Sequence, residues 1–518
     1  MKVSKILFIC IIALIMLTLP LASLFDESKK RNIEFIKQFE MRDSFTWGNI
    51  KSSSNKIQAF EDYFNDSMPF KYQLVTTYCN ALHSIDVSVF KDKVIYGKNN
   101  YIFLGVPKYE NLHRGQIASN RTDVQKTIYN IDILNDYFTQ KDIAFVYFVA
   151  PDKASIYSEY LPSWYTTTSL DTPITAMRNL IQQNDIYDYT LDFEQALLNA
   201  KLDYSDLLYG KTDTHYTSLG AYICYNKIID YINASYNMEI EKLQLESVES
   251  LDKTEGYSFK HMAGLDKKVE DFETILTFKN ANYFSELSDY EIEVEVFVNE
   301  YALNDKKVLF IGDSFRGQQE PLFVQTFEYN EFINISKLNE LSESSAIVEL
   351  VNEINPDIVI VERVERSSFI SAGKYNYHKA SILKEIYDNS VNFIEIDLLD
   401  TEKVSIQNIS NIYINEGFVH IQPSTSDPII ILEDINTTNN KIVIKSEIEV
   451  SSDCSFQVYY KSDGSDFEEQ YSVIDPLKKG VNEVYTLINS DTSIDSIRFD
   501  VNDENCFSVN NFNLKLLN

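Results

Sequence analysis

The chain has 518 residues, of which 44% are hydrophobic and 24% are charged, and this length and composition predict a folded protein of two domains rather than a disordered one. Its formal net charge of −32 excludes nucleic acid as the expected partner, because binding to phosphates needs clustered lysine and arginine. A neutral or cationic polymer fits this charge better.

The first 25 residues have the pattern of a signal anchor, a transmembrane helix that remains attached to the protein. Lys2 and Lys5 precede an apolar stretch that starts at Ile6 and continues to Leu24. This stretch of about 19 residues is long enough to span a bilayer, and the lysines favour a cytoplasmic start. Residues 21–23 form only a weak cleavage site, so the alternative is a cleaved signal and a secreted protein. Both interpretations place the chain after about residue 26 outside the cell membrane.

The next part of the chain, to about residue 140, predicts helices and one hairpin. A polar, helical-looking stretch is followed by residues 60–70, which are typical of a helix, and by residues 96–104, which are typical of a hairpin. Thr122 and Gln125 have capping-box spacing at the start of another helix, where apolar residues recur every three or four positions.

Three short apolar runs predict buried strands of a mostly parallel sheet. They cover residues 143–150, 308–311 and 358–361, and each is apolar on both faces, as expected when helices cover both sides of a sheet. A helical pattern over residues 347–354 separates the last two runs. Alternating strands and helices indicate a doubly wound α/β domain, in which ligands bind beyond the carboxyl ends of the strands.

The pattern changes after about residue 400 to short β-rich runs separated by polar turns. About eight strands in roughly 110 residues predict an all-β sandwich. The expected organisation is therefore an anchor over residues 1–25, an α/β domain over 26–400 and a sandwich over 401–518. Four aromatic residues of the sandwich are candidates for stacking on sugars, although burial in its core is the favoured interpretation: Tyr459, Tyr460, Phe467 and Tyr471.

The cysteines do not form a disulfide framework. The chain has five of them, too few for a stapled scaffold, and no Cys/His spacing resembles a zinc site. Cys454 and Cys506 are close enough in sequence to pair in an oxidising compartment, but unpaired thiols are the favoured interpretation.

A candidate nucleophile follows the second buried strand. Gly312-Asp313-Ser314 lies where that strand ends, and the glycine permits a sharp turn that presents the serine hydroxyl at the rim of the sheet. A triplet of this kind is weak evidence alone, since an ordinary strand-end turn has the same residues.

A candidate base and its orienting carboxylate lie about 100 positions earlier. Asp213 and His215 are two residues apart and would point to the same side of an extended segment, just before a predicted helix. A serine hydroxyl needs a neutral imidazole to remove its proton, and a carboxylate to fix the tautomer of that imidazole. We therefore interpret Ser314, His215 and Asp213 as a nucleophilic triad.

Several separated motifs together resemble the AlgX/AlgJ-type alginate O-acetyltransferases, an SGNH hydrolase-like family, and the related DHHW proteins of Gram-positive bacteria. The motifs begin, in chain order, at Gly97 (Gly-Lys-x-x-Tyr-Ile-Phe), Pro151 (Pro-Asp-Lys), Asp213 (Asp-x-His-Tyr) and Gly312 (Gly-Asp-Ser-Phe). The resemblance covers about residues 55–370. It implies an SGNH-like fold and the same triad, with the backbone N–H of Ser314 as one oxyanion donor; the sequence does not identify the second.

The resemblance also implies contacts with the substrate. Tyr101 and Tyr216 replace tryptophans of the family motifs, and they keep an aromatic face while adding a hydroxyl group. Arg316, two residues after the candidate nucleophile, is a third candidate for binding the substrate.

The activity that this resemblance implies is O-acetylation of an exopolysaccharide or cell-wall polysaccharide through an acetyl-serine intermediate. No cofactor or metal is expected, and an MBOAT-type membrane acyltransferase would supply acetyl groups from the other side of the membrane. The C-terminal sandwich would resemble a jelly-roll carbohydrate-binding module. Two alternatives remain open: a carbohydrate acetylesterase that uses the same triad, and a glycan-binding scaffold without catalysis.

Overall fold

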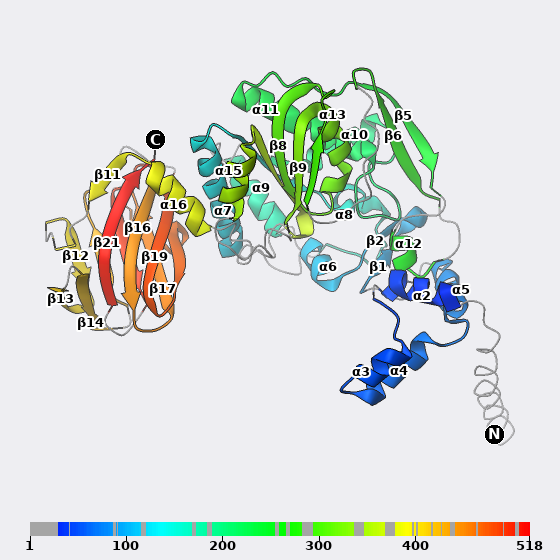
Figure 1. Cartoon of the computed structure of the whole chain (residues 1–518), viewed down its shortest axis with the longest axis horizontal. Coiled ribbons are helices and arrows are strands. Elements are labelled where there is room, and N and C mark those ends of the chain that lie inside the picture. Colours follow the sequence, from blue (N-terminus) through cyan, green and yellow to red (C-terminus); the bar gives the residue numbers. More distant parts are fainter. Residues whose placement is uncertain are drawn as a thin grey trace.

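The protein is described by a computed structural model of the whole chain (Figure 1). The predicted anchor and residue Cys506 of the predicted cysteine pair lie outside the described residues. The structure describes residues 29–517 except 41, 86, 88–89, 91, 115–120, 168–171, 184–188, 254–257, 266–269, 282–293, 336–345, 368–378, 396–397, 400–401, 416–417, 426, 436–440, 463–464, 491 and 503–506.

The first part of the described chain is helical and ends in a small hairpin, as the sequence predicts. Its elements are α2 (Lys29–Phe35), the π-helix η1 (Ile36–Glu40), α3 (Trp47–Ser52), α4 (Lys56–Asp66), α5 (Lys71–His83) and the antiparallel strands β1 (Val94–Tyr96) and β2 (Ile102–Leu104). In Figure 1, α3 and α4 project away from the rest of the molecule.

A six-stranded, mostly parallel sheet forms the centre of the α/β domain and confirms the predicted fold class. Its strands, in spatial order, are β4 (Thr190–Asp192), β3 (Ala144–Ala150), β10 (Ile358–Val364), β8 (Asn304–Gly312), β9 (Phe327–Asn334) and β7 (Val294–Val298). All neighbouring pairs are parallel except β7 with β9. Three of these strands are the predicted apolar runs, whereas β4, β7 and β9 were not predicted.

Alternating side chains of the central strands pack into two separate cores, one on each face of the sheet. Phe148 and Phe310 point to one face, where α10 (Glu194–Asp203), α11 (Ser218–Tyr236) and α13 (Glu320–Thr326) contribute to the core. Phe145 and Leu309 point to the other, which is covered by α7 (Arg121–Gln140), α9 (Pro173–Gln183) and α15 (Ala346–Ile354). Covering both faces buries the strands completely, which explains their continuous apolar sequences.

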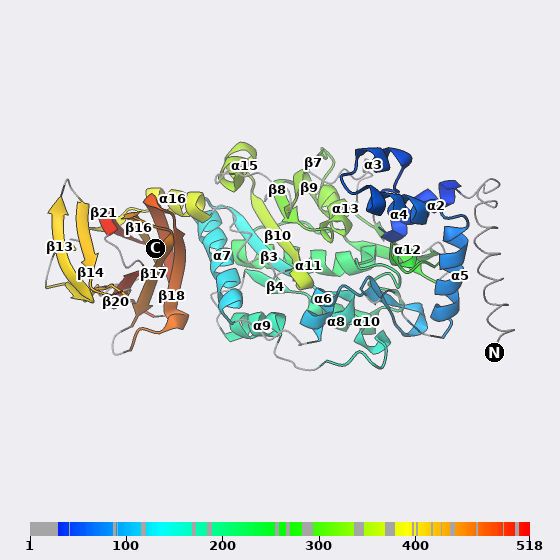
Figure 2. The same cartoon turned by 90° about the horizontal axis from the view of Figure 1, so that it is seen from below.

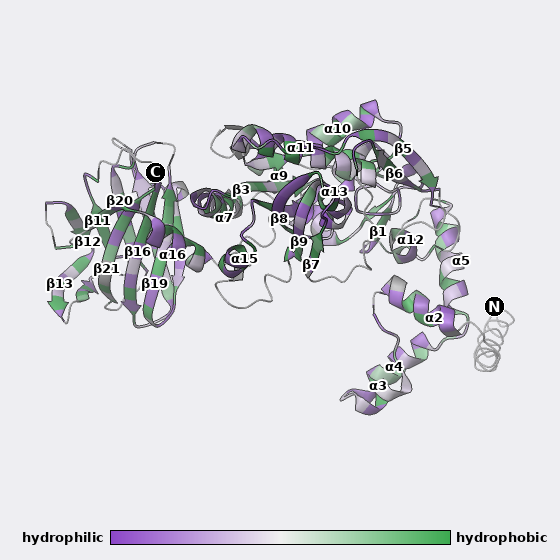
Figure 3. Ribbon diagram, turned by 45° about the horizontal axis from the view of Figure 1, so that its top comes forward, coloured by the Kyte–Doolittle hydropathy of each residue, from purple (hydrophilic) through white to green (hydrophobic). Residues whose placement is uncertain are grey.

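The C-terminal region is an all-β sandwich, as predicted. One sheet has the order β13 (Ile409–Asn415), β14 (Phe418–Pro423), β21 (Phe507–Leu516), β16 (Lys441–Val450), β19 (Gly480–Asn489), and β11 (Asn392–Glu395) also pairs with β21. The other has the order β12 (Val404–Gln407), β15 (Ile429–Leu432), β20 (Ser496–Val501), β17 (Cys454–Lys461), β18 (Ser472–Leu477). Because β11 belongs to the first sheet, the strands of the sandwich begin before residue 401. Figure 3 shows hydrophobic and hydrophilic residues alternating along these strands.

The sandwich packs directly against the α/β domain through α7 and α16 (Lys379–Asn389), which lie between the two in Figure 2. Val443 and Leu487 of the sandwich belong to the same buried cluster as α7. Lys441 of β16 pairs with Asp136 and lies 3.3 Å from Asp132, both on α7. A few residues of the sandwich therefore extend the core on this face of the α/β sheet, beside partly buried ion pairs, while the rest of the sandwich has its own core.

Candidate active site

Ser314 lies at the carboxyl end of β8, one of the central strands of the sheet, and its side chain is exposed. The turn that presents it is fixed by Asp313, whose carboxylate accepts hydrogen bonds from the backbone N–H of Phe315 at 3.1 Å and of Val364 at 2.7 Å. The second bond ties the turn to the end of neighbouring β10. The serine is therefore held by two strands at the edge where parallel sheets bind ligands.

Gly312 is required by close packing. A Cβ atom there would lie 2.5 Å from Oε2 of Glu362 and 3.1 Å from the Cβ of Arg316. Glu362 is fully buried, and burial together with the nearby charge of Asp313 raises the pKa of its carboxyl well above the ordinary value. A buried carboxyl whose protonated form is favoured therefore lies directly behind the nucleophile turn.

Gly312→Ala is expected to lower the rate of acyl transfer about 10- to 100-fold, because the turn must shift away from Glu362 and small displacements of a reacting atom are costly. We also expect a loss of about 1–3 kcal/mol in the free energy of unfolding, measured by urea denaturation. Gly48→Ala is the matched control, since its added Cβ would meet only Oγ1 of Thr46, at 3.4 Å. Unchanged activity of Gly312→Ala would contradict the tight packing.

Asp213 and His215 lie in the loop between α10 and α11, just before the first turn of α11. Asp213 Oδ1 accepts hydrogen bonds from the Thr214 backbone N–H at 2.6 Å and lies 3.1 Å from Nδ1 of His215. The segment is a tight turn of bends rather than the extended stretch expected from the sequence. The pairing of the two side chains is nevertheless present, because the carboxylate folds back over its own loop.

The structure brings the three predicted residues together in one hydrogen-bonded line. Nε2 of His215 lies 2.9 Å from Oγ of Ser314, although the two residues are 99 positions apart. With Asp213 accepting the proton of Nδ1, Nε2 of a neutral imidazole is free to accept the hydroxyl proton of the serine. This arrangement is suited to activating a serine nucleophile.

The surroundings keep Asp213 ionised. Burial alone would raise the pKa of this carboxyl, but the hydrogen bond and charge of His215, the Thr214 amide and the charge of Lys153 together hold it below its ordinary value. An ionised Asp213 stabilises the imidazolium that forms when His215 takes a proton.

Lys153, from the Pro-Asp-Lys motif, is buried beneath this loop at the start of α8 (Lys153–Ile156). Its ammonium group donates to the carbonyl oxygens of Ile102 at 2.6 Å, Lys211 at 2.8 Å and Gly210 at 3.1 Å, and also to that of Asp213. Burial lowers the pKa of Lys153 to about 7, against the opposing charges of Asp213 and Asp271. One side chain therefore fixes three successive parts of the Asp-x-His loop.

Asp271 holds the same loop from another side. Its fully buried carboxylate accepts hydrogen bonds from the backbone N–H groups of Lys211 and Thr212, both at 2.8 Å, and from Oγ1 of Thr212 at 2.6 Å. No sequence motif pointed to this role, since Asp271 lies in an acidic stretch with Glu270 and Glu273, more than 50 positions from the loop.

Arg366 is a further residue beside the triad that the sequence did not indicate. It pairs with Asp152, and its guanidinium lies 5.4 Å from the ring centre of Phe315, which in turn packs 5.0 Å from the ring of His215. Asp152 also donates its backbone N–H to Glu365 at 2.9 Å. The Pro-Asp-Lys motif therefore contacts both sides of the site, with Asp152 on one and Lys153 on the other.

Burial of Tyr101, Tyr216 and Arg316 argues against the substrate-binding roles expected for them. The ring of Tyr101 stacks on Tyr160 with 4.2 Å between ring centres, and Tyr216 packs edge-on against Phe315 at 5.0 Å. Arg316 is buried and pairs with Glu320 at 2.8 Å. These side chains support the loops of the site from inside, because hydrophobic packing competes successfully for the aromatic faces.

The four aromatic residues of the sandwich are more accessible than the favoured core interpretation expected. Tyr471 is exposed, and Tyr459, Tyr460 and Phe467 are half-buried. The hydroxyl of Tyr459 donates to Glu469 at 2.9 Å, and the guanidinium of Arg498 lies 4.8 Å from its ring centre.

Within the described residues, no group of His, Cys, Asp and Glu side chains is arranged to hold a metal ion. No helix in the described part of the chain has the length and apolar character needed to cross a membrane.

A comparison with known protein families matches part of the chain. The model of a family described as the SGNH hydrolase-like domain of acetyltransferase AlgX matches residues 94–336, which include all three triad residues. No curated protein matches the chain significantly.

Three solved structures illustrate the similarity. PatB1 of Bacillus cereus is 15% identical over 54% of this chain and 98% of its own, with a TM-score of 0.38. AlgX of Pseudomonas aeruginosa is 13% identical over 82% of this chain and 95% of its own, with a TM-score of 0.35. The O-acetyltransferase domain of Pseudomonas putida AlgJ is 15% identical over 54% of this chain and 92% of its own, with a TM-score of 0.35. Scores this low assign no role to any residue, but the family match over residues 94–336 identifies this part of the chain as an SGNH hydrolase-like domain of the AlgX type.

Proposed function

We propose that this protein is an O-acetyltransferase that modifies hydroxyl groups of a polysaccharide outside the cell membrane. The observation that carries the proposal is the hydrogen-bonded line from Ser314 through His215 to Asp213, at 2.9 and 3.1 Å, inside a domain that matches an acetyltransferase family. The exposed serine at the sheet edge leaves room for a large acceptor.

The first half of the reaction forms an acetyl-enzyme. Oγ of Ser314 attacks the carbonyl carbon of an acetyl ester while Nε2 of His215 takes the hydroxyl proton. Asp213 stabilises the resulting imidazolium, and the backbone N–H of Ser314 donates to the negative oxygen of the tetrahedral intermediate. His215 then gives its proton to the departing alcohol, which leaves an acetyl group on Ser314.

The second half transfers that acetyl group. A sugar hydroxyl replaces the departed alcohol, loses its proton to His215 and attacks the acetyl-serine carbonyl, and His215 returns the proton to Oγ of Ser314. Water in the place of the sugar would release acetate instead. The transferase therefore depends on an acceptor site that competes well with water.

We also propose where the protein is located and which partner supplies its acetyl groups. The apolar stretch of residues 6–24 supports a membrane anchor with both domains outside, where a membrane acyltransferase of the MBOAT type would deliver acetyl groups. The half-buried ring of Tyr459 and the exposed ring of Tyr471 support a glycan-binding role for the sandwich.

Transfer and hydrolysis are distinguished by the fate of the acetyl group. The purified full chain is incubated with p-nitrophenyl acetate and a panel of neutral oligosaccharides, and both acetylated oligosaccharide and free acetate are measured by mass spectrometry. We expect at least one acceptor to raise reporter release and to become acetylated, with both signals lost in Ser314→Ala. Release of acetate alone with every acceptor would favour the esterase. No turnover at all would favour the glycan-binding scaffold.

A further inference from the structure

The helical hairpin formed by α3 and α4 (residues 47–66), named here the helical arm, has an apolar face that no other described element covers. Ile57, Phe60 and Phe64 follow each other at helical spacing on α4 and are 77%, 51% and 62% exposed. Trp47 on α3 is 55% exposed. Only Ala59 and Asp66 of α4 are buried, so nearly all of its apolar side chains face solvent. Apolar patches of this kind mark an interaction surface.

The arm is held in a fixed direction at its base. The buried carboxylate of Asp66 accepts two hydrogen bonds from Arg42, at 2.7 and 2.8 Å, and one from the backbone N–H of Phe45 at 2.8 Å. Lys71 of α5 lies 3.3 Å from the same carboxylate. These interactions of the Asp66 carboxylate with Arg42 and Lys71 join the end of the arm to α5. The apolar face is therefore held in one direction, away from the α/β domain (Figure 1).

Charge distinguishes this region from the rest of the protein. Between residues 29 and 85 there are eight lysines and arginines and six aspartates and glutamates, a net charge of +2, whereas the whole chain carries −32. The helical arm itself has two lysines and three acidic residues, so the positive charge lies beside it, mainly on α2. An anionic surface would repel most of the molecule but would attract this part of it. Aromatic and aliphatic side chains interspersed with lysine are typical of segments that lie in the interfacial region of a bilayer.

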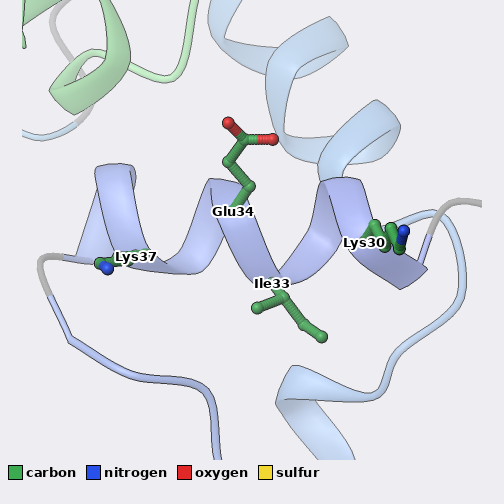
Figure 4. Close-up of a pocket in the computed structure, with 4 residues that line it drawn as sticks. All are labelled: Lys30, Ile33, Glu34 and Lys37. Atoms are coloured by element: carbon green, nitrogen blue, oxygen red, sulfur yellow. The ribbon is translucent and has the colours of Figure 1, made fainter.

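Helices α2 and α5 next to the arm also expose apolar side chains, and they pack together through Phe35 and Tyr72 with 5.5 Å between ring centres. Leu74 and Tyr78 of α5 are half or more exposed. A hollow of about 690 Å³ over α2 is lined by Lys30, Ile33, Glu34 and Lys37, and Figure 4 shows Ile33 and Glu34 on opposite sides of the helix with a lysine near each end. Basic and apolar side chains are therefore present on α2 as well, together with the acidic Glu34.

We propose that the helical arm docks on the surface of an anionic phospholipid bilayer, with Trp47, Ile57, Phe60 and Phe64 in its interfacial region. The position of the proposed anchor in the chain favours a bilayer as the surface that covers the arm. The apolar stretch proposed as the anchor ends at Leu24, five residues before α2 begins, and five residues span at most about 18 Å. Docking would hold the catalytic domain in one orientation, at a fixed height above the membrane that supplies its acetyl groups.

The test uses Trp47 as a reporter, since the chain has only two tryptophans. The full-length Trp164→Phe variant is reconstituted at low density into phosphatidylcholine and phosphatidylglycerol vesicles, with or without lipids brominated near the headgroup end of their acyl chains. We expect the brominated lipids to quench roughly half or more of the Trp47 emission, since an interfacial indole lies at that depth. The Trp47→Phe variant, which reports from Trp164 of the α/β domain, is expected to be unaffected.

A second variant separates the arm from the anchor. Phe60→Gln together with Phe64→Gln changes only exposed side chains, so the fold is retained. This variant is expected to float with the vesicles through its anchor but to lose most of the Trp47 quenching. If the Trp164→Phe protein floats with the vesicles but its Trp47 emission is not quenched, the arm does not dock on the bilayer. The proposed anchor would still be supported. A chain that does not float would overturn both. Shielding of Trp47 that depends on protein density rather than on lipid would identify a second copy as the occupant and overturn membrane docking.

Discussion

Alanine in place of His215 is expected to lower the rate of acetyl transfer about 10⁴-fold without unfolding the protein, because the base is removed while the oxyanion donor and the packing of the turn remain. The imidazole is partly exposed, and besides its packing against Phe315 its short contact is with Oγ of Ser314. Rates are measured with p-nitrophenyl acetate, and folding is measured by circular dichroism.

Two features make this result specific. Ser314→Ala alone, and the double variant Ser314→Ala with His215→Ala, should both lose about as much acetyl-transfer rate as His215→Ala alone. Residues that act as one unit give non-additive losses. His420→Ala is the matched control: Nδ1 of His420 also lies 2.9 Å from a serine oxygen, that of Ser508, but in the sandwich. Equal rates for His215→Ala and His420→Ala would contradict the catalytic assignment.

The Asp213 carboxyl makes the stability of the protein depend on pH. Because the pKa of Asp213 lies below its ordinary value in the folded protein, its ionised form contributes stability above its unfolded pKa, and this contribution is lost as pH falls through the folded pKa. Asp213→Asn is expected to remove this acid-side contribution and to lower the rate by up to about 10⁴-fold, since the imidazole would be held in the wrong tautomer.

Methionine in place of Lys153 is expected to lower the free energy of unfolding by about 3 kcal/mol and to reduce the rate of acetyl transfer as well. The substitution keeps the volume of the side chain but leaves the carbonyl groups beneath the loop without their buried donor, at a cost of about 1–3 kcal/mol for each group left unpaired. Loosening the loop moves His215 relative to Ser314. Urea denaturation and p-nitrophenyl acetate turnover measure the two effects separately.

The pH dependence of this effect follows from the lowered pKa of Lys153. Between about pH 7 and the ordinary lysine pKa, the unfolded chain binds a proton that the folded chain does not, so this group makes the free energy of unfolding rise with pH. The difference between wild type and Lys153→Met should therefore grow across that range. Lys98→Met, at an exposed lysine of the Gly-Lys motif, is the control and is expected to change stability by less than about 0.5 kcal/mol. Equal stability of Lys153→Met and wild type would contradict the supporting role.

The sequence predicted those features that depend on local pattern. Continuous apolar runs predicted β3, β8 and β10, because strands covered on both faces need apolar side chains in both directions. Strand β9 was missed because Glu328, Asn330 and Glu331 interrupt its apolar pattern, and the side-chain N–H of Asn330 donates to the Phe327 carbonyl, a contact that no local pattern shows.

Some residues of the candidate site could be predicted from local sequence patterns, and others could not. Asp213, His215 and Ser314 could be selected because their chemistry and spacing are visible in short motifs. Asp271 could not, since its role comes from contacts made by an irregular, distant segment. Lys153 was visible as part of a motif, but its buried position under the loop depends on the packing of α8 against the hairpin, and sequence spacing carries no information on that packing.

The acetyl-serine intermediate is tested most directly by the intact mass of the protein after brief exposure to an acetyl ester at low temperature. We predict a single added acetyl group on wild type, located on the peptide that contains Ser314, and none on Ser314→Ala. We also predict that an acceptor oligosaccharide shortens the lifetime of this adduct. An adduct of equal abundance on Ser314→Ala, or reporter turnover that Ser314→Ala retains, would contradict the central claim.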